Sequence, residues 1–270
     1  MSASPLTDAA GTAHAPAGDG ARIVSLVPSI TELLFDLGLE GALVGRTAFC
    51  VHPVERIRSV RSVGGTKQVN FEKLRRAAPT HVIVNIDETP RDLAEEIAGM
   101  GITVVVTHPI EVRDNIALYR LMGAVFGRTA EAEALTAEFE GAYAEVRRVA
   151  EALSERRVLY LIWKEPWMTV SADTYIARML ALIRWTTIGH DPDIRYPAIE
   201  MSDVLLRGTD LVLFSSEPFP FTDRHVAEFA ETFPDHAAKA HMIDAQMTSW
   251  YGSRAVAGLR YLGALATALG

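Results

Sequence analysis

Two short segments of the sequence combine a glutamate, a proline and a large aromatic residue. They read KEPW at 164–167 and EPF at 217–219, and each follows a continuous apolar run that predicts a buried strand. Proline has no N–H to donate, so each Glu-Pro pair ends its strand. Ligands of open α/β sheets bind at the carboxyl ends of the parallel strands. The alternative is loop packing alone, but the repetition of the pattern favours a binding site.

Aromatic and polar residues gather in further predicted loops, namely FCVHP at 49–53, VGGTK at 63–67, IRYP at 194–197 and TSWYGSR at 248–254. Aromatic rings in solvated loops supply flat contact area at low entropic cost, which suits a large planar ligand. The two glycines at 64–65 permit close backbone approach. For Trp250 and Tyr251 the alternative interpretation is packing onto the last helix.

Catalytic motifs are missing from the sequence, which contains no G-x-S-x-G, Walker loop or H-E-x-x-H. Cys50 and His52 are two residues apart, a spacing that does not orient a thiol and an imidazole for proton transfer. We therefore predict a non-enzymatic protein with no catalytic residue and no required cofactor. His52 is the candidate metal ligand, because neutral imidazole binds transition metals well, and a hydrogen-bonded loop histidine is the alternative.

Composition limits the class of protein. The chain has 270 residues, of which 49% are hydrophobic and 22% are charged, values typical of a globular protein. A formal charge of -8 argues against a nucleic-acid partner, and the single cysteine excludes an intrachain disulfide. No apolar run reaches the roughly 18–20 residues that a membrane helix needs. We expect a monomer without a membrane span.

The first residues are rich in Ala, Gly, Ser and Pro. They lack the basic region and the apolar stretch of a secretion signal, so residues 1–21 are predicted to be a flexible tail. As the chain stands, this predicts a cytoplasmic protein. If a signal has been removed, the same chain is periplasmic or lies at the cell surface.

From Arg22 onward, short apolar runs alternate with helical patterns, which predicts α/β structure with parallel sheets. In the first half, strands are expected at 23–26, around Val44, at 81–85 and at 103–107, with helices at 29–37 and 90–100. Ser29 is expected to cap the first helix. In the second half, strands are expected at 158–163, 210–216 and 241–244, and helices at 174–183, 200–206, 223–233 and 254–269.

The middle of the chain, 112–157, is helical, with a break near Gly127-Arg128. Its second helix begins at Thr129, is rich in Ala and Glu and contains no proline, so we expect a rigid spine instead of a flexible linker. The predicted architecture is therefore two α/β lobes, 22–111 and 158–270. One long helix within 112–157 bridges them, and a ligand cleft lies between the lobes.

Taken together, these segments resemble the helical-backbone metal receptors, the class III substrate-binding proteins of ABC transporters. The resemblance is closest to the cobalamin-binding branch and extends from Arg22 to the C-terminus. It is carried by RIVSLVPSITELLFDLGL at 22–39, FCVHP, VGG, VNFEKL at 69–74, PTHVIV at 79–84, MGITVVV at 100–106, WKEPWMTVSADTYIARML at 163–180, RYPAIEMSDVLL at 195–206 and SWYGSR at 249–254. The architecture of this family agrees with the one predicted above.

The resemblance implies a metal chelate as ligand, most of all cobalamin or another corrinoid, with haem or an iron-siderophore as alternatives. The ligand-binding residues that it implies are Phe49, His52, Tyr196 and Trp250, with Trp163, Glu165, Trp167 and Tyr251 alongside them. The loop patterns described above add Glu217, Phe219 and Arg254. Two positions depart from the cobalamin receptors. Thr66 stands where these receptors can carry tryptophan, and His52 stands where they have an aromatic residue, which indicates a ligand with an open metal site.

The resemblance also implies a partner, the permease of an ABC transporter. One acidic residue in each lobe would dock onto it, Glu72 in the first lobe and Asp203 in the second. Two other hypotheses remain open. The protein would be an intracellular corrinoid- or metal-handling enzyme or chaperone with His52 or Cys50 as metal ligand, or an interaction module with a vestigial cleft.

Overall fold

A computed structural model describes residues 6–189 and 193–269 of the chain. These residues form two compact units. Unit 1 comprises the chain up to Pro109 together with 113–139 and 251–254, and unit 2 comprises 110–112, 140–250 and the chain from Ala255. Each unit contains one parallel β-sheet flanked by helices, which confirms the predicted fold class.

The sheet of unit 1 has five strands in the order β3-β2-β1-β4-β5, and all neighbouring pairs are parallel. The strands are β1 (Ile23–Ser25), β2 (Leu43–Thr47), β3 (Ser62–Gly64), β4 (His81–Asn85) and β5 (Thr103–Thr107). Four of them lie where the apolar runs predict them. The short edge strand β3 was not predicted.

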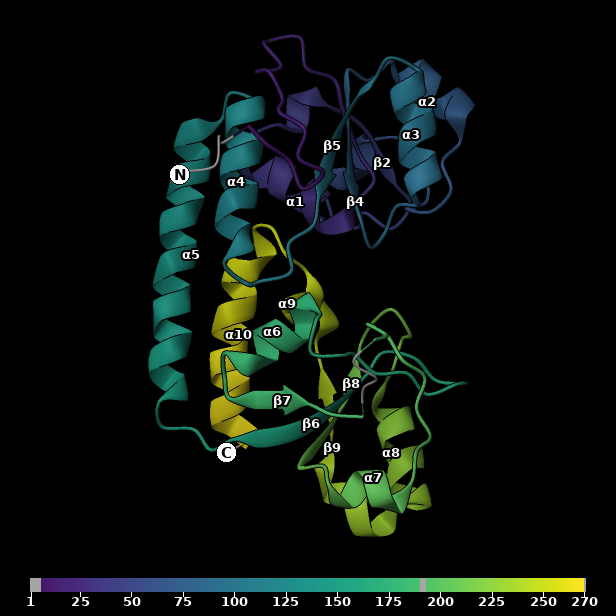
Figure 1. The fold of residues 1–270 in the computed structure, drawn as a ribbon, viewed down its shortest axis with the longest axis vertical. Coiled ribbons are helices and arrows are strands. Elements are labelled where there is room, and N and C mark those ends of the chain that lie inside the picture. Colours follow the sequence, from purple (N-terminus) through teal and green to yellow (C-terminus); the bar gives the residue numbers. More distant parts are fainter. Residues whose placement is uncertain (1–5, 190–192, 270) are drawn as a thin grey trace. The chain divides into compact units, whose positions relative to one another are not determined.

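Helices cover both faces of this sheet, namely α1 (Pro28–Asp36), α2 (Phe71–Ala77), α3 (Arg91–Gly99) and α4 (Asp114–Val125). On one face, Val82 and Val84 of β4 share a core with Leu74 of α2 and with Leu93 and Ile97 of α3. Helices α1 and α4 lie on the other side of the sheet (Figure 1). Since both faces are covered, β4 is buried along its whole length, which explains its unbroken apolar sequence.

The N-cap of helix α1 lies two residues earlier than predicted. Val27 is the N-cap, Pro28 occupies the first turn, and Ser29 lies inside the helix, so the predicted cap at Ser29 is wrong. Proline is favoured at this position because it has no N–H that would stay unpaired and because its φ already suits a helix.

The sheet of unit 2 has four parallel strands in the order β7-β6-β8-β9. They are β6 (Arg156–Leu161), β7 (Trp185–Thr187), β8 (Leu211–Ser215) and β9 (Ala240–Ile243). The helices of this unit are α6 (Tyr175–Ala181), α7 (Asp203–Arg207), α8 (Asp223–Thr232), α9 (Ala245–Ser249) and α10 (Arg254–Leu269). The three-residue strand β7, again at a sheet edge, was not predicted.

The two faces of this sheet are buried in different ways. Leu161 and Phe214 pack with Leu206 of α7 and Phe229 of α8 in one apolar core. On the opposite face, the Tyr160 hydroxyl lies 2.7 Å from that of Thr248 in α9, and burial raises the pKa of Tyr160. This face therefore buries a polar group, and it does so with a hydrogen-bond partner.

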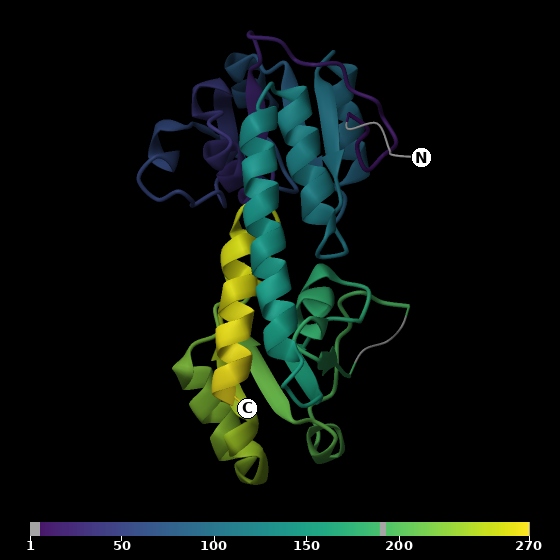
Figure 2. The ribbon, with the colours of Figure 1, turned by 90° about the vertical axis from the view of Figure 1, so that its left-hand side faces the viewer.

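Helix α5 (Thr129–Ala150) runs from unit 1, which includes its residues up to Phe139, into unit 2. A turn at 126–128 separates it from α4, where the sequence predicts a break. In unit 2, the second half of α5 lies beside α10 (Figure 2), and a Cβ at Gly263 would stand 3.9 Å from Val146 Cγ2. Among the described residues, none of the helices has the length and apolar character of a membrane span.

The N-terminal segment differs from the predicted flexible tail. Residues 1–5 lie outside the described residues, but the following ones pack against unit 1. The Ala9 N–H donates to the Val106 carbonyl of β5 at 3.0 Å, and the Ala17 N–H donates to the Val125 carbonyl at 2.8 Å. Because β5 is an edge strand, it has backbone groups available for such pairing, which composition alone does not reveal.

Candidate functional site

The predicted binding residues fall on two sets of loops, one in each unit. We define the unit 1 loop face as Phe49, Val51, His52, Val54 and Ile86, which follow β2 and β4. We define the unit 2 loop face as Trp163, Tyr196, Glu217, Phe219 and Trp250, which follow β6, β7, β8 and β9. Both sets stand after the carboxyl ends of parallel strands, where ligands of α/β sheets bind.

The unit 1 loop face exposes apolar side chains. Phe49 is 62% exposed, and Val51, Val54 and Ile86 are each about half exposed. A Cβ at Gly65 would stand 3.4 Å from the Phe49 ring, so the glycine leaves room for this aromatic side chain. Sequence reasoning missed the three aliphatic residues. The sequence does contain a sign of them, because each is an apolar residue in a loop shortly after a strand, where polar residues are more usual.

His52 and Cys50 have different surroundings in the same loop. His52 is half-buried, whereas Cys50 is buried and its Sγ accepts a hydrogen bond from the Thr31 hydroxyl at 3.0 Å. Burial raises the pKa of the Cys50 thiol. Because a thiolate is the form that binds metals, Cys50 does not suit the metal-ligand role. Within the described part of the chain, no group of three or more His, Cys, Asp or Glu side chains is placed to hold a metal ion.

Tyr251 and Arg254 have protein partners within unit 1. The buried Tyr251 hydroxyl donates to Glu88 Oε1 at 2.9 Å, and burial, together with this carboxylate, raises the pKa of Tyr251. Arg254 Nε donates to Glu32 Oε2 at 2.7 Å, and both side chains are largely buried. The segment between them is held as well, because Gly252 N–H donates to Asn115 Oδ1 at 2.7 Å. Both residues thus fasten the segment 251–254, and their contact with ligand stays a prediction.

Aromatic rings dominate the unit 2 loop face. Trp163 is 41% exposed, and its ring meets that of Phe219 edge to face at 5.6 Å. Tyr196 is also exposed, and the Arg195 guanidinium lies 5.9 Å from the centre of its ring. These exposed rings can make the flat contacts that a planar ligand needs.

A carboxylate of the same face is held by an indole. Trp250 Nε1 donates to Glu217 Oε1 at 2.6 Å, and Gln246 Nε2 lies 3.5 Å from the second carboxylate oxygen. Trp250 itself is buried. The N–H of this buried ring orients the half-buried carboxylate.

Trp167 has different surroundings from Trp163, to which it is linked through the rings of Phe219 and Phe221. The Trp167 ring stacks on Phe221 at 6.0 Å with an interplanar angle of 6°, and it meets Phe214 of β8 edge to face. Glu165, Trp167 and Phe229 of α8 line a cavity of about 610 Å³ in unit 2. Trp167 and Glu165 thus share this cavity, while Trp163 belongs to the loop face.

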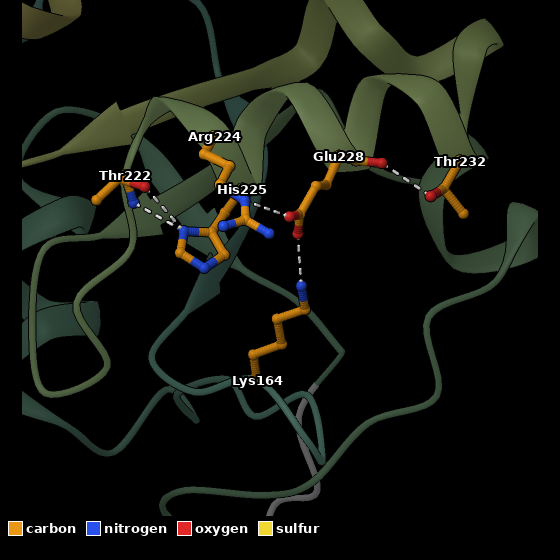
Figure 3. Close-up of polar contacts among 6 residues, drawn as sticks. All are labelled: Lys164, Thr222, Arg224, His225, Glu228 and Thr232. Atoms are coloured by element: carbon orange, nitrogen blue, oxygen red, sulfur yellow. Dashed lines mark hydrogen bonds and ion pairs between the residues drawn. The ribbon is translucent and has the colours of Figure 1, made fainter.

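An ion-pair network lies at the rim of this cavity (Figure 3). Lys164 Nζ lies 2.7 Å from Glu228 Oε2, and Arg224 Nε lies 2.9 Å from Glu228 Oε1. The hydrogen bond from Lys164, followed by the one from Arg224, lowers the pKa of Glu228. The sequence does not reveal this network, because Lys164 is 64 residues away from Glu228. Only Arg224, four residues before Glu228 on α8, is near it in sequence.

The two predicted docking residues are exposed on short helices. Glu72 of α2 forms an ion pair with Arg76. Asp203 begins α7, where His236 Nε2 lies 3.4 Å from its Oδ1. The neighbouring Val204 is 82% exposed. Both carboxylates are therefore accessible to a partner.

Comparison with known proteins adds to this geometry. The family described as "Periplasmic binding protein" matches residues 23–242, which is most of the chain. This chain belongs to the periplasmic binding protein family. Curated relatives of this family member include the vitamin B12-binding protein of Pectobacterium carotovorum subsp. carotovorum (strain PC1), which is 21% identical over 73% of this chain and 72% of the relative. The vitamin B12-binding protein of Yersinia pestis (strain Pestoides F) is 24% identical over 74% of this chain and 71% of its own length.

Solved structures share the fold of this periplasmic binding protein. The periplasmic vitamin B12 binding protein BtuF of Vibrio cholerae has a TM-score of 0.80 at 15% identity and covers 92% of this chain and 97% of its own. The periplasmic haem-binding protein RhuT from Roseiflexus sp. RS-1 has a TM-score of 0.79 at 21% identity and covers 93% of this chain and 99% of its own. The same fold thus occurs in proteins named for two different chelates, so fold alone does not choose a ligand.

Proposed function

We propose that this protein binds a metal chelate, first of all cobalamin or another corrinoid, and delivers it to an ABC transporter. The proposal rests on the exposed aromatic and aliphatic side chains that follow the carboxyl ends of strands in both parallel sheets. Phe49, Trp163 and Tyr196 are exposed although they are large and apolar. Binding is favoured when a ligand removes exposed apolar groups from water, because burial of apolar surface lowers the free energy of the complex.

The chemistry of the two loop faces supports a corrinoid. A corrinoid combines a broad ring system with a polar edge, so it needs apolar contact area and a few polar anchors. The unit 1 loop face supplies aliphatic and aromatic contacts, and the Glu217 carboxylate of unit 2 supplies an anchor that Trp250 holds in place. Curated relatives named for vitamin B12 binding support the same ligand class.

His52 favours a second candidate, a chelate with an open axial position such as haem. Its imidazole is half-buried on the unit 1 loop face, and neutral imidazole is a good ligand for iron and cobalt. In the enzyme or chaperone hypothesis, Cys50 is disfavoured because its thiol is buried and its pKa is raised, so only His52 remains as a ligand.

Glu72 and Asp203 are proposed to dock onto the permease. Exposed carboxylates on separate units would meet basic residues of the partner, which sets orientation and association rate more than affinity. An import receptor works on the side of the membrane from which its ligand enters. The proposal therefore places the protein in the periplasm or at the cell surface.

Titration of the purified protein identifies the ligand class. Cyanocobalamin, dicyanocobinamide, haemin and a ferric siderophore are added separately, and tryptophan fluorescence and visible absorbance are followed. We expect saturable quenching by the corrinoids, because Trp163 is exposed on a loop face. A saturable shift of the haemin Soret band without a corrinoid response would favour the second candidate. No response to any of the four would contradict the proposal.

The role of His52 is tested with aquocobalamin or haemin bound to wild type and to His52→Ala. If His52 ligates the metal, the visible bands of the bound chelate shift in the variant. The matched control is His241→Ala, because His241 is a half-buried histidine on β9, outside both loop faces. Identical spectra for all three proteins would show that His52 does not contact the metal.

A further inference from the structure

Strand β5 lies at one edge of the unit 1 sheet, with β4 as its neighbour in the strand order. The Thr107 carbonyl accepts a hydrogen bond from the Ile86 N–H at 3.1 Å, on the side of β4. In a parallel pair, the N–H and C=O of one residue point to the same side, and successive residues alternate between the two sides. The backbone groups of Val106 therefore point away from β4, toward the outer edge of the sheet.

The sequence of this edge favours pairing with another chain. Residues 102–107 read ITVVVT, six β-branched residues in succession without a charge, a glycine or a proline. Segments of this kind have high β propensity, and they associate edge to edge when they are exposed. The opposite edge strand, β3, has three residues, so it gives a second chain little to pair with.

The N-terminal segment, residues 6–17, covers the outer side of β5 at Val106. The Ala9 N–H donates to the Val106 carbonyl at 3.0 Å, and the Val106 N–H donates to Asp8 Oδ2 at 3.0 Å. Both outward-pointing backbone groups of Val106 are thus paired. The Asp8 carboxylate accepts the hydrogen bond that a backbone carbonyl of an added strand would otherwise accept.

The Asp8 carboxylate also folds the segment around itself. Its Oδ1 accepts hydrogen bonds from the N–H groups of Ala10 at 3.0 Å and Thr12 at 2.9 Å. Its Oδ2 lies 2.9 Å from His14 Nε2, and both of these side chains are buried. One carboxylate therefore joins the turn to the edge strand, and its charge strengthens each of these hydrogen bonds.

The N-terminal segment pairs with itself instead of extending the sheet. The His14 N–H donates to the Leu6 carbonyl at 2.9 Å, and Thr7 and Ala13 form an antiparallel bridge. Residues 6–17 contain isolated bridges of this kind but no strand. A folded cover closes an edge without presenting a new strand for another chain to pair with.

We propose that the outer edge of β5 is a self-association surface that the N-terminal segment keeps covered, and that the Asp8 carboxylate holds the segment there. The partner that fits this edge is a second copy of the chain. Antiparallel pairing of two β5 strands about Val105 would set threonine against threonine and valine against valine, with no like charges opposed. None of these residues belongs to either loop face, so the proposal does not rest on the proposed chelate function.

Asp8→Asn tests the role of the carboxylate, because it keeps the shape of the side chain. An amide has a single oxygen, so it cannot accept both from the Val106 N–H and from the N–H groups of the turn. In dilute protein, the Val106 amide should exchange its hydrogen about tenfold faster or more, measured by nuclear magnetic resonance. In sedimentation velocity at rising concentration, the average mass of the variant should rise toward two chains, while wild type stays at one.

Ala9→Pro opens the same edge by a second route, because it removes the N–H that bonds to the Val106 carbonyl. The Gly11 N–H donates to the Asp8 carbonyl, so Ala9 is the second residue of a turn, where proline is favoured and the variant is expected to fold. It should associate as well, at higher concentrations than Asp8→Asn, because the hydrogen bond that it removes is uncharged.

The matched control is Asp19→Asn, which removes the same charge from an exposed position outside the N-terminal segment and should leave the chain monomeric. Thr103→Lys places a charge at an exposed position of β5, so in combination with Asp8→Asn it should restore the monomer. Equal association of Asp19→Asn, or association of Asp8→Asn that Thr103→Lys does not reverse, would overturn the assignment of β5 as the surface.

Three further results would overturn the proposal. If Val106 exchanges faster in Asp8→Asn and the variant still stays monomeric at the highest concentration, the uncovered edge does not self-associate. If neither the exchange nor the mass changes, Asp8 does not hold the segment on β5. If wild type associates as strongly as the variants, the segment does not prevent association.

Discussion

The two loop faces occupy equivalent places after parallel strands, but they use different side chains. The unit 1 loop face exposes Phe49 and three aliphatic residues. Tyr251, which also belongs to unit 1, is buried against Glu88. The unit 2 loop face exposes Trp163 and Tyr196 and holds the Glu217 carboxylate with an indole N–H. The first supplies apolar contact, and the second adds aromatic contact with a charged anchor. Under the proposed function, the unit 2 loop face would determine which chelate is recognised.

The units also differ in how ion pairs support their loops. In unit 1 the Arg254–Glu32 pair is largely buried, whereas in unit 2 the Lys164–Glu228 pair is more exposed. Removing one partner of a buried pair leaves an uncompensated charge, whereas an exposed pair contributes little. The same kind of contact should therefore matter far more in unit 1.

The largest effect is expected for Arg254→Ala. This change leaves Glu32 without its partner in a largely buried position, so the free energy of unfolding should fall by about 3 kcal/mol. Urea denaturation followed by circular dichroism measures the loss. A loss under 1 kcal/mol would show that the pair does not stabilise the segment 251–254.

A smaller effect is expected for Glu217→Gln in unit 2. The amide oxygen still accepts from Trp250 Nε1, but the hydrogen bond loses its charge, so the free energy of unfolding should fall by about 1 kcal/mol. Chelate affinity should fall as well if the negative charge is the anchor of this face. An unchanged affinity in a titration of the folded variant would assign Glu217 a structural role only.

Alkylation tests whether Cys50 is buried although its neighbours Phe49 and Val51 are exposed. Because burial raises the pKa of this thiol, iodoacetamide at pH 8 should leave the native protein unmodified and should alkylate it in 6 M guanidinium chloride. Mass spectrometry measures the added group. Rapid alkylation of the native protein would show that the loop opens.

The smallest effect is expected for Lys164→Ala. Lys164 lowers the pKa of Glu228, so its stabilising contribution is present above the ordinary glutamate pKa and is lost as the pH falls through the lower value of the folded state. Wild type and variant should therefore differ only slightly at pH 7 and converge at acid pH. Thermal unfolding between pH 3 and pH 7 shows the trend. A difference that grows toward low pH would contradict the role of Lys164.

Much of the fold could be predicted from the sequence, because strands buried on both faces have continuous apolar sequences. The runs at 81–85 and 103–107 become β4 and β5 with those bounds. The missed strands β3 and β7 have three residues each and lie at sheet edges, where too few residues are buried to give a periodic pattern. The packing of the N-terminal segment could not be predicted from composition, because it rests on backbone hydrogen bonds to Val106 and Val125 and on contacts of the buried Asp8 carboxylate.

The candidate site could be predicted only in part. The structure exposes Trp163 and Tyr196, whereas Trp167, which is predicted to bind ligand with them, packs against Phe221. Which of two nearby rings turns inward depends on partners far along the chain. The same holds for Tyr251, whose partner Glu88 is 163 residues away.

The most direct test of the central claim is a calorimetric titration with cyanocobalamin of wild type, Phe49→Ala and Trp163→Ala. Each variant removes one exposed ring from one loop face, and Val204→Ala removes an exposed apolar side chain outside both. If both faces bind the same chelate, each ring variant should weaken binding about tenfold or more, while Val204→Ala stays within twofold. Wild-type affinity in either Phe49→Ala or Trp163→Ala would contradict the account.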